Sequence, residues 1–164
     1  MRVKPEQMDK ALTKLHPVYL VSGDEPLQLN EVADAIRLAA KSNEYTTREV
    51  LSVETGFDWS ELTMAADSMS IFAEKKLIDL RLPSGKPGTD GAKVINAYCQ
   101  RLPEESILLI TTAKLTAATL KTKWCQSIDK VGCVVQVWPL EGADLIQWLQ
   151  QRAQKRGLQI ELDG

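Results

Sequence analysis

Apolar runs and amphipathic segments alternate along the chain, which is the pattern of strands and helices laid down in turn. Residues 18–21 and 107–110 are apolar at every position, as expected for strands covered on both faces. Further strands are predicted at residues 47–53, 76–82 and 133–137. The sequence therefore predicts an α/β fold in which helices flank a parallel sheet.

Helices are predicted between these strands. The first begins at Pro26 and has one apolar face, made by Leu29, Val32, Ala33, Ile36 and Ala40. A short helix follows Asp58 as its N-cap, another contains residues 94–102, and a fourth contains residues 120–131. The stretch Pro83–Gly91 holds three glycines and two prolines, so we expect a mobile surface loop there.

The end of the chain departs from this alternation. Pro139 interrupts it, and an amphipathic helix is predicted from Glu141 to Gly157. We therefore expect an α/β domain at residues 1–140 and the start of a second, truncated helical domain at 141–164. The basic residues Arg152, Lys155 and Arg156 are interpreted as a solvated helix face.

Composition narrows the class of protein. With 44% hydrophobic and 26% charged residues among 164, the chain has enough apolar material for a core, which excludes a disordered protein. The net charge of -2 argues against a broad basic surface for nucleic acid. No apolar run approaches the roughly 18 residues that span a bilayer, and residues 1–10 carry charges, so we expect a cytoplasmic protein.

Cysteine and histidine offer little chemistry. The three cysteines, Cys99, Cys125 and Cys133, fit neither a disulfide framework nor a metal knuckle and are predicted to be buried free thiols. The single histidine, His16, is predicted to be a surface residue. It has no second histidine with which to form a metal site or a catalytic relay, so no metal and no catalytic residue are expected.

The turn after the first strand is where a phosphate-binding loop would lie. Counted from Gly23, the positions for the second glycine, the lysine and the hydroxyl residue hold Gln28, Leu29 and Asn30. Asp24 and Glu25 add negative charge, so nucleotide hydrolysis is disfavoured and no cofactor is expected. The glycine cluster at 85–91 matches no phosphate-binding pattern either. An ATPase of the same fold class stays the alternative.

Asp79 and the apolar residues within 69–72 are two further candidates for a functional role. Asp79 invites comparison with a phospho-accepting receiver domain, but no lysine follows the fifth strand, and we interpret Asp79 as a solvated strand residue. Met69, Ile71 and Phe72 gather three large apolar groups at a helix-to-strand junction. They are either core residues or an exposed anchor for a partner's pocket.

These pieces together resemble the delta subunit of the bacterial DNA polymerase III clamp loader. The resemblance covers almost the whole chain and rests on three stretches, residues 18–27 (VYLVSGDEPL), 69–73 (MSIFA) with 77–83 (LIDLRLP), and 84–88 (SGKPG). It implies a RecA-like fold of the AAA+ type with a degenerate nucleotide site. It also implies a non-catalytic subunit of the DNA polymerase holoenzyme that binds the sliding clamp and opens its ring, or holds it open, for loading onto primed DNA.

The resemblance also assigns residues and partners. Met69, Ile71 and Phe72 would contact the clamp, with Ile71 and Phe72 in its apolar pocket. Other loader subunits would hydrolyse ATP and would assemble with this one through a C-terminal region that is missing here. DNA would be contacted only indirectly or weakly.

Overall fold

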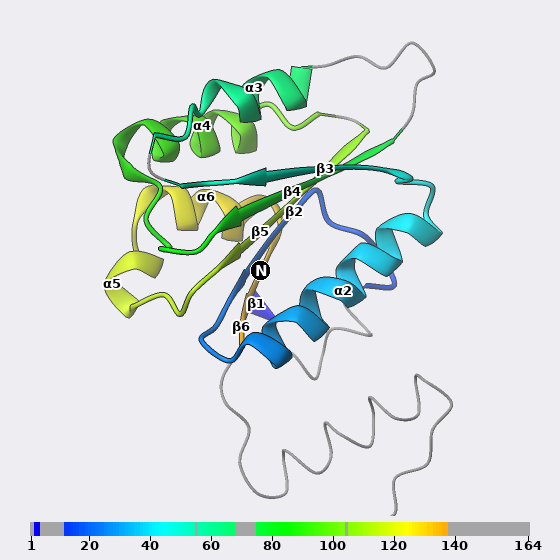
Figure 1. Ribbon diagram of the computed structural model, residues 1–164, viewed down its shortest axis with the longest axis horizontal. Helices are drawn as coiled ribbons and strands as arrows, with labels where there is room; N and C mark the ends of the chain where they lie inside the picture. Colours follow the sequence, from blue (N-terminus) through cyan, green and yellow to red (C-terminus); the bar gives the residue numbers. More distant parts are fainter. Residues whose placement is uncertain (1, 4–11, 55, 68–74, 104, 138–164) are drawn as a thin grey trace, which may run out of the picture.

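A six-stranded parallel sheet forms the centre of the fold (Figure 1). The computed structural model describes residues 2–3, 12–54, 56–67, 75–103 and 105–137. The strands are β1 (Arg2–Val3), β2 (Val18–Ser22), β3 (Thr47–Ser52), β4 (Lys76–Leu82), β5 (Ser106–Thr112) and β6 (Cys133–Gln136). Their order across the sheet is β1-β6-β2-β5-β4-β3, and every pairing is parallel.

Helices cover both faces of this sheet (Figure 1). They are α2 (Pro26–Ser42), α3 (Ser60–Asp67), α4 (Gly88–Gln100), α5 (Ala117–Leu120) and α6 (Lys123–Val131). One face packs against α2, and the other packs against α3, α4 and α6. The α/β architecture with a parallel sheet flanked by helices is thus confirmed.

The central strands show why their sequence is apolar throughout. All five residues of β2 are buried. Tyr19 and Val21 pack with α2, whereas Val18 and Leu20 belong to the core on the opposite face. A strand that is covered on both sides needs apolar residues at every position, because neither face meets water.

Some boundaries differ from the sequence prediction. The helix expected over residues 120–131 is two helices, because Thr122 has extended backbone angles between α5 and α6. The loop expected to reach Gly91 ends at Pro87, since α4 begins at Gly88. Gly85, expected on a mobile surface loop, is instead buried, with a φ of +68° that suits glycine. The strand β1 was not predicted, because two residues carry no periodic pattern.

The predicted helix from Glu141 to Gly157 and the basic residues near its end lie outside the described residues. The division at residue 140 therefore stays a prediction. Among the helices that the structure describes, none has the length and apolar character needed to cross a membrane.

Candidate functional site

The turn between β2 and α2 is tightly enclosed. The backbone N–H of Gly23 donates to the carbonyl of Thr112 at 3.2 Å. A Cβ atom at position 23 would lie 2.8 Å from the carbonyl oxygen of Val137, closer than real Cβ contacts come. Glycine is needed here because the turn passes directly against another part of the backbone.

Two carboxylates of this turn bind backbone amides. Asp24 Oδ1 accepts the N–H of Lys114 at 2.9 Å, and Glu25 Oε1 accepts the N–H of Leu27 at 3.3 Å in the first turn of α2. A phosphate-binding loop uses such amides, together with a lysine, for the phosphate itself. Here Glu25 engages an amide at the start of α2, Asp24 beside it is bonded to the backbone N–H of Lys114 after β5, and Leu29 stands at the lysine position. The turn therefore presents negative charge where a nucleotide would need positive charge.

The three residues expected to contact the clamp, Met69, Ile71 and Phe72, lie outside the described residues. The structure therefore neither brings them together nor separates them. What it describes are the elements on either side, α3 up to Asp67 and β4 from Lys76. Leu62 and Ala65 anchor α3 in the core, whereas Met64 on the same helix is 60% exposed.

Lys76 ties these two elements together. Its Nζ donates to the carbonyl of Ala65 near the end of α3 at 3.1 Å and to Glu49 Oε2 on β3 at 3.0 Å. The side chain of Lys76 is 15% exposed, so the ion pair with Glu49 is partly shielded from water. The described elements on either side of residues 68–74, α3 and β4, are therefore joined to each other and to β3 by one ammonium group.

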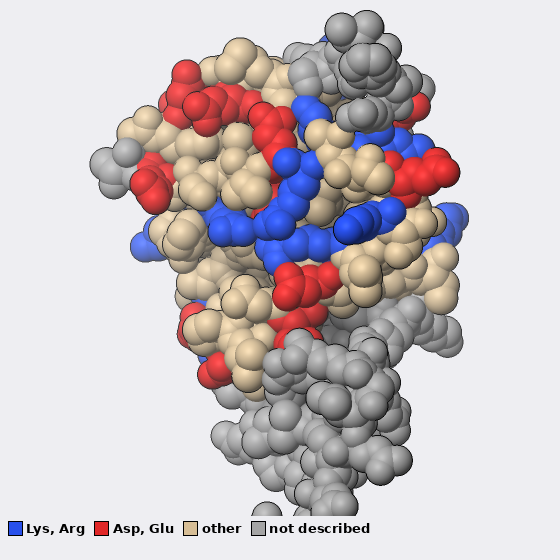
Figure 2. Space-filling model, turned by 45° about the vertical axis from the view of Figure 1, so that its right-hand side comes forward, with Lys and Arg blue, Asp and Glu red and all other residues tan. Residues whose placement is uncertain are grey.

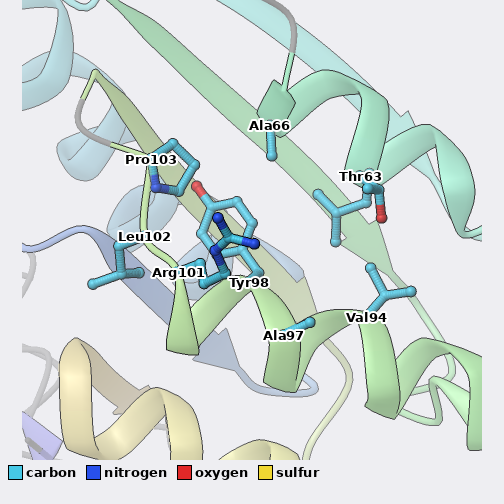
Figure 3. Close-up of a pocket in the computed structure, with 9 residues that line it drawn as sticks. Thr63, Ala66, Val94, Ala97, Tyr98, Arg101, Leu102 and Pro103 are labelled. Carbon is cyan, nitrogen blue, oxygen red and sulfur yellow. The ribbon is translucent and has the colours of Figure 1, made fainter.

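A pocket of about 730 Å³ lies between α3 and α4 (Figure 3). Leu62 and Ala66 of α3 face Val94 and Tyr98 of α4 across it. The Tyr98 hydroxyl is buried and has no hydrogen-bond partner among the described residues. Burial raises the pKa of Tyr98 above its usual value. The pocket thus has a mixed lining, in which Thr63, Arg101 and the phenol of Tyr98 accompany the apolar side chains.

Asp79 in the middle of β4 is fully buried, so its interpretation as a solvated residue is wrong. Its Oδ2 accepts Arg37 Nε at 3.0 Å, Arg48 Nε at 3.1 Å and Arg48 Nη2 at 2.8 Å. Arg81 Nη2 approaches the same oxygen to 3.8 Å. The carboxylate is buried because α2 and the strands close over it; all its hydrogen bonds are made by Oδ2, whereas Oδ1 has no hydrogen-bond partner in the described part of the chain.

Sequence reasoning missed this cluster because its members come from three separate elements, α2, β3 and β4. One signal was present. Asp79 lies between Ile78 and Leu80 in a strand that is otherwise buried, and Arg81 follows two positions later on the same face. A carboxylate in such a strand requires a cation nearby, because an unpaired buried charge is costly.

The cysteines and His16 complete the candidate residues. All three cysteines are free and buried, as predicted, and burial raises the pKa of Cys99 to about 11. His16 is half-buried rather than on the open surface, because its ring packs edge-on against Tyr19 with centroids 5.9 Å apart. Partial burial lowers the pKa of His16. Among the described residues, no cluster of side chains has the composition of a metal site.

The sequence of this chain is similar to those of two curated proteins. The chain is 27% identical to DNA polymerase III subunit delta of Escherichia coli K12 over 164 residues, which are 99% of this chain and 47% of the relative. It is 26% identical to the Haemophilus influenzae subunit of that name, over 98% of this chain and 47% of the relative. The chain thus spans about half the length of these relatives.

Solved structures share the fold. The Bacillus subtilis DNA clamp loader delta protein superposes with a TM-score of 0.69 at 17% identity, over 93% of this chain and 48% of the other. A DNA polymerase III gamma subunit-related protein of Thermotoga maritima gives a TM-score of 0.54 at 12% identity, over 90% and 49%. These similarities confirm the AAA+ type of fold. The family model described as DNA polymerase III, delta subunit, matches residues 19–137. The chain belongs to the DNA polymerase III delta subunit family.

Proposed function

We propose that this chain is the part of a clamp loader that binds the sliding clamp and opens its ring, or holds it open, for loading onto primed DNA. The observation that carries the proposal is the family match over residues 19–137, which includes the expected contact segment. The Bacillus subtilis structural relative is itself described as a clamp loader protein. Met69, Ile71 and Phe72 form the contact, with Ile71 and Phe72 filling an apolar pocket on the ring.

Clamp opening of this kind needs binding energy and no bond chemistry. A protein that binds the open ring more tightly than the closed one shifts the equilibrium by its differential affinity. Apolar anchors concentrate that affinity in a few side chains. The joining of α3, β3 and β4 by Lys76 supports this role, because a contact made next to fixed elements loses less conformational entropy on binding.

The other components of the loader fit the same proposal. With carboxylates in its β2–α2 turn, this chain leaves ATP hydrolysis to neighbouring subunits. Assembly with those subunits would use a C-terminal region in the remaining half of the relatives' length. DNA would be reached indirectly, through the clamp, and the complex would act in the cytoplasm as part of replication.

Surface plasmon resonance with the sliding clamp of the same organism tests the proposal. Ile71→Ala/Phe72→Ala should weaken clamp binding by a factor of about 100 or more, because two apolar anchors are lost. Met64→Ala is the matched control, since Met64 is a large exposed apolar residue on the adjacent helix. Circular dichroism establishes that each variant is folded.

The outcomes separate cleanly. Loss of binding in the folded double variant, with normal binding by Met64→Ala, supports the proposed contact. A wild-type chain that does not bind the clamp contradicts the proposed function. A double variant that unfolds shows that Ile71 and Phe72 are core residues, and single substitutions at Met69 then test whether any of the contact remains.

A further inference from the structure

Three arginines share one buried carboxylate on the α2 side of the sheet. Arg37 and Arg48 donate hydrogen bonds to Asp79, while the 3.8 Å approach of Arg81 is too long for one. Arg37 also donates to Asp34 at 2.6 Å. A guanidinium carries five N–H donors, so these contacts leave most of the donors of Arg48 and Arg81 available.

The available donors reach solvent. The side chains of Arg48 and Arg81 are 45% and 47% exposed, although Asp79 between them is completely buried. The carboxylate therefore orients the guanidinium groups from below without neutralising them all. Together with the pair to Asp34, three positive and two negative charges meet here, and a net positive charge remains.

Large apolar side chains lie beside these charges. Val50 on β3 is directly opposite Asp79 in the strand ladder and is 45% exposed. Leu38 on α2 is 66% exposed and lies one helical turn from Asp34. We name Arg37, Arg48, Arg81, Leu38 and Val50 the arginine face.

The face is open because α2 alone covers this side of the sheet in the described part of the chain. The most extensive contacts of α2 with the sheet are made with β2 and β5, toward its centre, and Arg37 extends from α2 to Asp79 on β4, whereas β3 is the edge strand. Figure 2 turns this side of the molecule toward the viewer and shows Lys and Arg side chains in a band across its middle, with acidic groups above and below.

We propose that the arginine face docks an acidic, partly apolar segment of a partner protein in the loader assembly. The proposal rests on the proposed function for the identity of the assembly, and on charge complementarity for the chemistry of the segment. Arginines on a shared carboxylate are pre-oriented to bind further carboxylates in two-pronged fashion. Asp79 thus holds the guanidinium groups in place before binding, and carboxylates of the partner would accept the hydrogen bonds that these groups still have to donate.

The composition of the face favours protein over nucleic acid. Exposed Leu38 and Val50 offer nothing to a phosphate backbone but add apolar contact area to a protein interface, where arginine is also enriched. A net charge of -2 gives the chain no general attraction to DNA.

Binding of the chain to the purified clamp, to each purified loader subunit and to a primed DNA oligonucleotide tests the proposal. The main variant is Arg81→Ala, because the 3.8 Å approach makes Arg81 the arginine least needed for folding. Arg81→Lys retains the positive charge but lacks the planar guanidinium group that can donate two parallel hydrogen bonds. Arg48→Gln removes the charge at a second arginine of the face. Lys93→Ala, an exposed cation on α4 on the opposite face of the sheet, is the matched control.

The expected result is that one protein partner binds about tenfold more weakly to Arg81→Ala and Arg48→Gln, and that raised salt weakens the wild-type complex. Lys93→Ala should bind normally. Normal protein binding by both folded arginine variants would overturn the proposal, as would a loss confined to the DNA oligonucleotide or the absence of any salt-sensitive protein partner. If clamp binding depends on Phe72 but not on Arg81, the proposed function is supported and the clamp is excluded as the partner of the arginine face. The binding of the other loader subunits to the arginine variants then decides the inference.

Discussion

Arg37 on α2 and Asp79 on β4 are 42 positions apart in sequence and are joined by a hydrogen bond of 3.0 Å. The bond links the helix that covers one face of the sheet to β4, whose Leu77 belongs to the same apolar cluster as the buried side chains of that helix. Arg37 is 17% exposed at its side chain and Asp79 is fully buried, so neither charge is well solvated. The pair therefore fixes the position of α2 relative to β4.

Asp79→Ala should destabilise the protein by about 3 kcal/mol, because it leaves Arg37 without its buried partner and removes both hydrogen bonds that orient Arg48. Urea denaturation followed by circular dichroism measures the loss. Asp34→Ala is the control, since that carboxylate is 69% exposed and its removal should cost less than about 1 kcal/mol. Equal losses in the two variants would show that burial of Asp79 is not what makes its pairing important.

Gly132→Ala should lower the melting temperature by about 10 °C, because a Cβ there would lie within the backbone contact distance of the Val18 carbonyl oxygen. The clash is with β2 itself, so no side chain can turn away to relieve it. Gly56→Ala is the comparison, since nothing lies within 4 Å of a Cβ at that position and only its φ of +85° is unfavourable. A smaller effect at Gly132 than at Gly56 would contradict the packing argument.

Stability should fall at alkaline pH. Burial raises the pKa of Cys99 to about 11 and that of Tyr19 to about 12. The unfolded chain loses the Cys99 proton from about pH 9, whereas the folded chain keeps it to about pH 11. Stability present below pH 9 is therefore lost across that interval, by about 1 kcal/mol per pH unit for such a group.

Urea denaturation at about pH 8 and about pH 10.5 measures this dependence. Cys99→Ala should be less stable at both values but should show a shallower decline between them, because one buried proton no longer titrates. An unchanged slope in the variant would mean that the Cys99 thiol does not contribute to the pH dependence.

Magnesium ATP should not raise the melting temperature. With Glu25 on an amide at the start of α2 and Asp24 beside it, bonded to the backbone N–H of Lys114, a nucleotide would meet two carboxylates and no lysine at the P-loop lysine position. A genuine site saturated with ligand at a hundred times its dissociation constant would add about 2.7 kcal/mol of stability, which a thermal shift assay detects easily. A stabilisation of that size would favour the ATPase alternative over the non-catalytic role.

The sequence predicted the elements whose burial is regular. The strands β2 and β5 and the helix α2 follow from apolar runs and from one apolar helix face, because both depend on local periodicity. The environment of Asp79 could not be predicted in this way. Its partners Arg37 and Arg48 are 42 and 31 residues away, and only the folded arrangement of α2, β3 and β4 brings them to one oxygen.

The same limit applied to the candidate sites. The failure of the phosphate-binding pattern at Gln28, Leu29 and Asn30 was evident from residue types alone, because that pattern is local. The hydrogen bond from Lys114 to Asp24 spans 90 residues and had no local signal. The contact residues Met69, Ile71 and Phe72 remain predictions.

The bonds made by the Lys76 ammonium group have a mechanical consequence for the proposed ring-opening function. A pull on residues 68–74 is transmitted to the end of α3 and to the start of β4, and Lys76 passes it on to β3 through Glu49. From there the load spreads through the hydrogen-bonded ladders from β3 to β4 and from β4 to β5. Under the proposed function, strain at the contact would therefore be shared among three hydrogen-bonded strands of this chain rather than borne by one loop.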